Sequence, residues 1–133
     1  MIHFFFYQIL DNMDVQLTVS NIFTFIHKLK LYHWSTKSYA RHKATDQLHK
    51  SLSELNDKFV ETMIATYGRP TFDADFDLTL CQWSDDDAIN ELTSYRDCLI
   101  NHIPFADTDV DLLNVRDEMV SDINQALYLF SFC

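Results

Sequence analysis

The chain has 133 residues and a formal net charge of −10, from 20 acidic and 10 basic side chains. This length can bury a core without disulfides, and we expect a single domain over residues 1–133. With only one glycine and two prolines, the chain cannot supply the turns of an all-β protein and is expected to form a few long helices. An acidic surface repels phosphate backbones, so the composition argues against DNA binding and favours the attraction of cations.

The cysteines and the N-terminal segment bear on the cellular compartment. Three cysteines without a CxxC pair indicate reduced thiols in a cytoplasmic protein. Residues 1–10 (MIHFFFYQIL) form an apolar arm that has neither the basic start nor the cleavage site of a secretory signal. The arm falls well short of the ~20 residues that span a membrane, so no membrane partner is expected. We expect it to extend the first helix or to pack on a neighbouring subunit.

The first half of the chain predicts two long helices. The first is expected to start near Asp11 or Asp14 and to end near Thr36. The second is expected over residues 39–67, because Gly68-Arg69-Pro70 is a typical helix stop. The apolar face of this second helix consists of Leu48, Leu52, Leu55, Phe59 and Met63.

The second half predicts two more helices after a long connection. Residues 71–83 have no clear hydrophobic period and are expected to form a crossover, with or without a short helix inside it. Ser84 and the three aspartates that follow it predict a third helix, which ends near Ile103. The aspartates of residues 107–111 open a fourth helix that reaches Phe130. The expected fold is therefore all-α, a ferritin-like four-helix bundle with a long crossover between helices two and three.

The second helix carries two pairs of metal-ligand residues, His42 with Asp46 and Asp57 with Glu61. On an ideal helix these four side chains lie within about 100° of arc. The gap between Asp46 and Asp57 separates the pairs by roughly 16 Å along the axis, whereas metal ligands lie within ~2–2.6 Å of the ion. The pairs can meet only if the helix packs antiparallel on a second copy. The spacing therefore predicts two equivalent metal sites shared across a two-fold dimer.

His33, at the end of the first helix, is the fifth candidate ligand. Two imidazoles and three carboxylates form a mixed nitrogen and oxygen set that suits Fe(II), Mn(II) or Zn(II). A solvated helix face is the competing interpretation, and it stays open because Lys50 and Ser53 on the same stripe are also polar. His49 is interpreted as an ordinary surface residue.

The pattern His33-Trp34, His42-x-x-x-Asp46 and Asp57-x-x-x-Glu61 resembles the ferroxidase signature of the Dps proteins. These DNA-protection-during-starvation proteins are mini-ferritins of the ferritin-like superfamily. The resemblance covers residues 15–132, with a shorter interval between the two histidines than in that family. It implies that the two histidines and Asp46 of one subunit bind iron together with the Asp-x-x-x-Glu of its two-fold mate, within a hollow dodecameric cage.

The resemblance also implies a function. Fe(II) would be oxidised by hydrogen peroxide or oxygen and stored as Fe(III) mineral, with zinc or manganese as substitute ions. DNA-binding members of the family usually use a flexible basic tail, which this chain lacks. The stretch SYARHKATD also resembles short proteins encoded by phages and large viruses, so a virion-associated location stays open. The alternatives are a non-enzymatic structural or shell protein, of viral origin in one version, and a metal-binding homologue without redox turnover.

Overall fold

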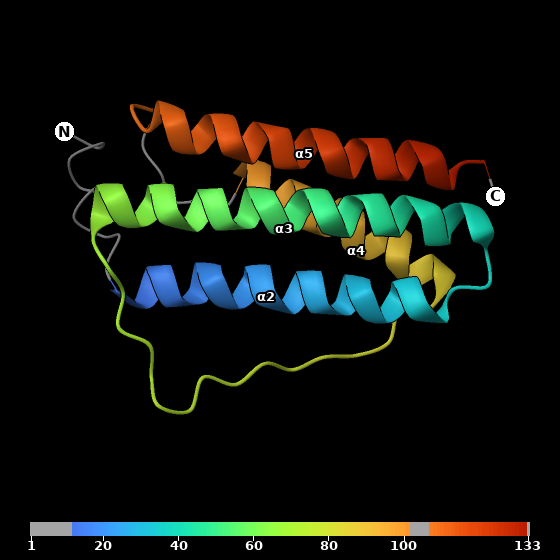
Figure 1. Ribbon diagram of the computed structural model, residues 1–133, viewed down its shortest axis with the longest axis horizontal. Coiled ribbons are helices and arrows are strands. Elements are labelled where there is room, and N and C mark those ends of the chain that lie inside the picture. The colour runs from blue at the N-terminus through green and yellow to red at the C-terminus, as the bar shows by residue number, and fades with distance from the viewer. Residues whose placement is uncertain (1–11, 102–106, 133) are drawn as a thin grey trace.

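The computed structural model describes residues 12–101 and 107–132, which form four helices (Figure 1). These are α2 (Asn12–Ser35), α3 (Tyr39–Tyr67), α4 (Asp85–Asn101) and α5 (Val110–Phe130). The described ranges contain no strand, so the expected all-α class and the four helices are confirmed. The apolar arm of residues 1–10 lies outside the described residues.

Local signals in the sequence account for the helix ends. The Ser38 hydroxyl accepts a hydrogen bond from the Arg41 backbone N–H at 3.2 Å and so caps the start of α3. At the other end Gly68 adopts a positive φ of 96°, and its N–H donates to the Ile64 carbonyl at 2.8 Å. Both ends of α3 fall at the expected residues.

The start of α4 is a capping box. The Ser84 hydroxyl accepts from the Asp87 N–H at 3.1 Å, and the Asp87 carboxylate accepts from the Ser84 N–H at 2.9 Å. Hydrogen bonding to Ser84 lowers the pKa of Asp87, because it favours the ionised form of the carboxyl group. The expected beginning of the third helix at Ser84 is therefore explained by side-chain capping.

The core lies between the inner faces of the helices. α3 packs against both α2 and α5, and α4 packs against α5 and α2 (Figure 1). The apolar positions predicted on the second helix are buried or half-buried as expected. The side chains with no exposed surface include Leu29, Leu52, Phe59, Leu92, Leu112, Met119 and Ile123.

Residues 68–84 connect α3 to α4 without any helix and run beside α2 (Figure 1). Contacts with α2 hold them there. The Asp73 N–H donates to the Gln16 side chain at 3.4 Å, and Phe76 packs edge-on against Phe23. The ring centroid of the buried Trp83 lies 5.7 Å from that of Phe25.

Candidate metal centre

His33 and His42 meet where α2 ends and α3 begins. The two helices are joined by only residues 36–38, so the last turn of one lies beside the first turn of the other. The imidazole rings stack with their centroids 4.0 Å apart and an interplanar angle of 15°. His33 is buried, with 6% of its surface exposed, and His42 is half-buried.

Each of these rings is held by the backbone of the other residue. His33 Nδ1 lies 2.9 Å from the His42 carbonyl oxygen, and His42 Nδ1 lies 3.0 Å from the His33 carbonyl oxygen. A carbonyl oxygen can only accept a hydrogen bond, so Nδ1 carries the proton in both rings. In the neutral rings Nε2 is then unprotonated and can bind a metal ion.

Thr45 adds a third contact to this arrangement. Its buried hydroxyl lies 2.8 Å from the Arg41 carbonyl oxygen, to which it donates, and 2.9 Å from His33 Nδ1. Because the hydroxyl proton is donated to the Arg41 carbonyl, the hydroxyl oxygen accepts a hydrogen bond from the His33 Nδ1–H. Thr45 therefore fixes both the orientation and the tautomer of His33.

Asp46 lies one turn further along α3 and brings a carboxylate to the histidines. Its Oδ1 is 4.0 Å from His33 Nε2, and its Oδ2 is 3.5 Å from the Lys50 ammonium. Burial opposes its ionisation, but Lys50 and then His33 bring the pKa of Asp46 below its ordinary value. An ion with ligand distances of ~2.1 Å can contact both the carboxylate and Nε2.

The environment keeps His33 in the form that binds metals. Burial is the largest cause that lowers the pKa of His33, and the neighbouring His42 and Lys30 lower it further. The His42 carbonyl and Asp46 act in the opposite direction without reversing the shift. The imidazole is therefore neutral near pH 7, with its Nε2 lone pair available.

Asp57 and Glu61 are exposed on α3 and do not join this group. Within the described residues, no three or more His, Cys, Asp or Glu side chains come close enough together to hold a metal ion. A single chain thus brings three of the five predicted ligands together pairwise and leaves the other two further along the same helix.

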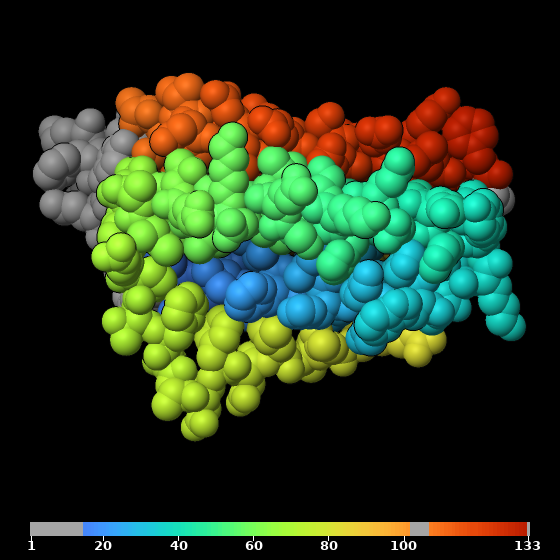
Figure 2. All heavy atoms as spheres, viewed as in Figure 1, coloured from blue at the N-terminus to red at the C-terminus, as the bar shows by residue number. Residues whose placement is uncertain are grey.

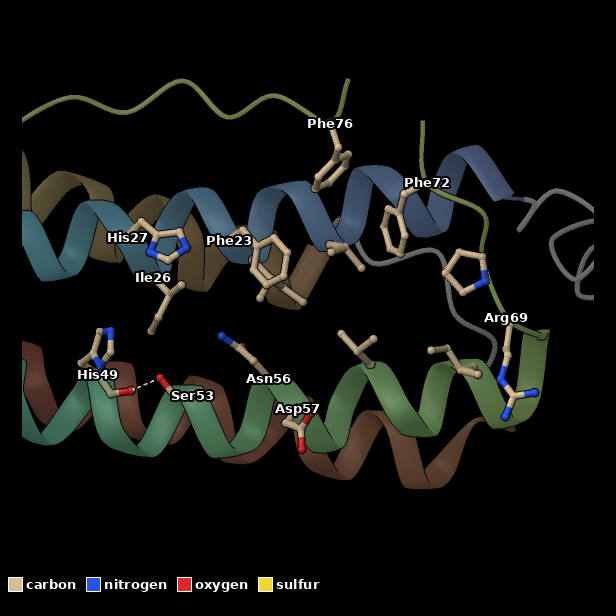
Figure 3. Close-up of a pocket in the computed structure, with 15 residues that line it drawn as sticks. Phe23, Ile26, His27, His49, Ser53, Asn56, Asp57, Arg69, Phe72 and Phe76 are labelled. Atoms are coloured by element: carbon tan, nitrogen blue, oxygen red, sulfur yellow. Dashed lines mark hydrogen bonds between the residues drawn. The ribbon is translucent and has the colours of Figure 1, made fainter. Parts of the chain in front are cut away.

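A groove of about 690 Å³ runs between α2 and α3 (Figures 2 and 3). Its walls are mostly apolar, and Phe23, Ile26 and Phe72 are among them. Asp57 lies along its α3 side, so one of the predicted ligands borders the groove (Figure 3).

His49 is the residue that the sequence interpretation missed. It is half-buried and lines the groove from α3, while His27 lines it from α2 (Figure 3). Burial lowers the pKa of His49, and Lys30, His27 and His33 lower it further. The sequence spacing could have indicated this position. His49 follows His42 by seven residues, about two helical turns, and so lies on the same side of α3.

Comparison with known proteins gives a family without an assigned activity. The chain belongs to the family described as "Family of unknown function (DUF5856)", whose model matches residues 33–130. The match begins at His33 and includes all five candidate ligands. No curated protein and no solved structure matches the chain. Among the described residues, no helix is sufficiently long and apolar to cross a membrane.

Proposed function

We propose that this protein is a Dps-like mini-ferritin that oxidises Fe(II) with hydrogen peroxide or oxygen and stores the Fe(III) product. In this proposal the bundle is ferritin-like, and residues 68–84 are its long crossover. The subunits form two-fold dimers that assemble further into a cage. The observation that carries the proposal is the pair of carbonyl-bound histidines, His33 and His42, beside the Asp46 carboxylate.

The hydrogen bonds of these histidines support metal binding. A histidine that ligates a metal typically donates its other ring N–H to a carbonyl or carboxylate, which fixes the ring and makes the ligating nitrogen more basic. His33 and His42 both have that arrangement. The Nε2 atoms are therefore oriented by the protein itself, and binding an ion costs little reorganisation.

A second copy would complete the ligand set. Asp57 and Glu61 are exposed, and on the same straight helix the gap from Asp46 to Asp57 alone is roughly 16 Å. An antiparallel α3 from a second copy would bring its Asp57 and Glu61 to the two histidines and Asp46 of the first. By symmetry, the dimer would contain two such sites.

The proposed ligands suit the oxidation of iron. Two Fe(II) ions each release one electron, and one hydrogen peroxide molecule takes up both electrons to give two hydroxide ions. Carboxylate oxygens are hard ligands and stabilise the more highly charged Fe(III) over Fe(II), while the neutral imidazoles keep both ions bound. The net charge of −10 raises the local concentration of Fe(II) around the protein.

Iron oxidation by purified protein tests this function. After anaerobic addition of Fe(II), peroxide should produce ferric absorbance much faster with the parent than with buffer alone. The double variant Asp57→Ala/Glu61→Ala should lose this acceleration. The matched control Asp75→Ala/Asp77→Ala removes two exposed carboxylates from the α3–α4 connection and should keep it. Equal rates for the parent and the Asp57/Glu61 variant would refute the site.

Metal analysis tests the alternative function. Zinc or manganese in the purified protein without ferric product would indicate a homologue that lacks redox turnover.

Complementation between variants tests whether the site is shared. His42→Ala/Asp46→Ala and Asp57→Ala/Glu61→Ala should each be inactive alone. Co-expression should restore activity, because a mixed dimer has one complete site and one empty site. Random pairing then gives about a quarter of the parental rate. If mass spectrometry shows mixed dimers but the co-expressed variants remain inactive, the site is not shared between subunits.

A further inference from the structure

We propose that two copies of this chain dock through the outer face of α3 in an antiparallel register set by charge, and that this docking needs no metal ion. The proposal rests on the shared site described above and specifies what holds the two copies together. Its evidence is the distribution of charge along α3, the exposure of Tyr39, and the apolar groove beside the helix.

The charges of α3 are separated along its length. Residues 39–50 contain three basic and one acidic side chains, for a net charge of +2, and residues 51–67 contain three acidic and one basic, for a net charge of −2. A parallel pair of such helices would set like charge against like. An antiparallel pair sets the basic half of each helix against the acidic half of the other.

The residues available for this pairing face outward. Arg41 is turned inward, where it donates to the Tyr32 hydroxyl and the Asp85 carbonyl. Asp57 and Lys58 are also exposed, and the exposed charges that share one face are Lys43 and Lys50 in the basic half, and Glu54 and Glu61 in the acidic half. On an ideal helix these four lie within about 40° of arc, opposite the buried Leu52 and Phe59.

Their positions define one register. Lys43 and Glu61 are equally distant from residue 52, and so are Lys50 and Glu54. A two-fold axis beside residue 52 therefore places Lys43 opposite Glu61 of the second copy and Lys50 opposite Glu54 of the second copy. Each of these ion pairs occurs twice in the dimer.

The candidate metal ligands give the same register. The midpoint of the four candidate ligands on α3 lies within one residue of position 52; these ligands are His42, Asp46, Asp57 and Glu61. One residue corresponds to about 1.5 Å along the helix. Lys43, Lys50 and Glu54 are not candidate ligands, and Glu61 is the one residue that belongs to both sets.

Tyr39 supplies an apolar contact in this register. It lies at the first turn of α3 on the same side as the charged residues, 74% exposed, with the Lys43 ammonium 5.6 Å from its ring centroid. The two-fold places it opposite Ala65 of the second copy, one residue from Ile64. Ile64 lines the groove between α2 and α3, as do Arg69 and Phe72. Docking would thus cover an aromatic ring and part of an open apolar groove together.

Sedimentation of the metal-free protein tests the proposal. In the presence of a chelator and at low ionic strength, the parent should sediment as a dimer or as a multiple of dimers. Lys50→Glu and Glu54→Lys should each raise the dimer dissociation constant about tenfold or more, since each places like charges together at two positions. The combination Lys50→Glu/Glu54→Lys should restore the parental constant. Glu118→Lys, an exposed change on α5, is the matched control and should have no effect.

Two results would overturn the proposal. One is a monomer without metal under conditions in which the metal-loaded protein dimerises. The other is failure of the double charge exchange to restore association while circular dichroism shows intact helices. The measurements also distinguish failure of this docking proposal from failure of the proposed function. Restored dimerisation without iron oxidation would remove the ferroxidase assignment alone, whereas iron oxidation in dimers insensitive to these charges would remove the docking register alone.

Discussion

At the scale of single residues, the two Nδ1 atoms of His33 and His42 determine what the α2–α3 junction can bind. Both atoms donate to backbone carbonyls, so the remaining ring nitrogens are left as lone-pair donors. Metal sites commonly depend as much on such supporting hydrogen bonds as on the ligands themselves. Thr45 is the residue that supports His33 from within the core.

Thr45→Val should weaken metal binding without unfolding the protein. Valine keeps the shape but removes the oxygen that accepts from His33 Nδ1, so the ring loses one of its two fixed contacts. We expect a loss of about tenfold or more in Co(II) affinity, measured by the visible absorbance of the bound ion. Thr45→Ser keeps the oxygen and should retain parental affinity. If Thr45→Val binds Co(II) as tightly as Thr45→Ser, the hydroxyl does not position His33.

At the scale of elements, α4 depends on its first turn. Ser84 and Asp87 exchange two hydrogen bonds there, and the carboxylates of the first turn interact favourably with the positive end of the helix dipole. The connection that precedes α4 has no helix of its own, so the cap decides where the helix begins.

Ser84→Ala should lower the free energy of unfolding by about 1 kcal/mol, the usual loss for an N-cap hydroxyl. Urea denaturation followed by circular dichroism measures it. Ser94→Ala, an exposed change in the middle of α4, is the control and should be neutral or slightly stabilising, because alanine has the higher helix propensity. An unchanged urea midpoint in Ser84→Ala would show that the capping box contributes nothing to stability.

At the scale of the whole molecule, the neutral histidines between α2 and α3 link stability to pH. The pKa values of His33 and His49 are lowered in the folded state, with burial as the largest cause. Below about pH 6.5 the unfolded chain therefore binds more protons than the folded chain at these residues, and acid favours unfolding. The lowered pKa of Asp46 changes stability only near and below pH 3.8, the ordinary pKa of an aspartate, which is more acidic than the range in which the histidines titrate.

The urea midpoint should fall as the pH is lowered from 7.5 to 5.5. His33→Gln retains a donor for the His42 carbonyl but removes the titration, so the fall should be smaller in this variant. The comparison is made between the pH dependences of the two proteins, since the substitution also shifts absolute stability. If both proteins show the same pH dependence, His33 does not contribute to the linkage.

Most of the fold could be predicted from the sequence because its signals are local. The bounds of α3 follow from Ser38 and Gly68, and the start of α4 follows from Ser84 and its aspartates. The predicted end of the third helix near Ile103 falls in residues 102–106, outside the described part. The sequence left open whether residues 71–83 contain a short helix, and they contain none. Their conformation depends on contacts with α2, which no local pattern reports.

The sequence by itself determined the four helices and the two candidate ligand pairs on α3, because helical periodicity fixes both the face and the axial spacing of each residue. Only the tertiary structure decided that His33 and His42 stack and bind each other's carbonyls, and that His49 lines a groove. These features depend on how closely α2 and α3 approach and in which rotation. The buried side chains of both helices set that approach together, and the pattern of either helix alone does not contain it.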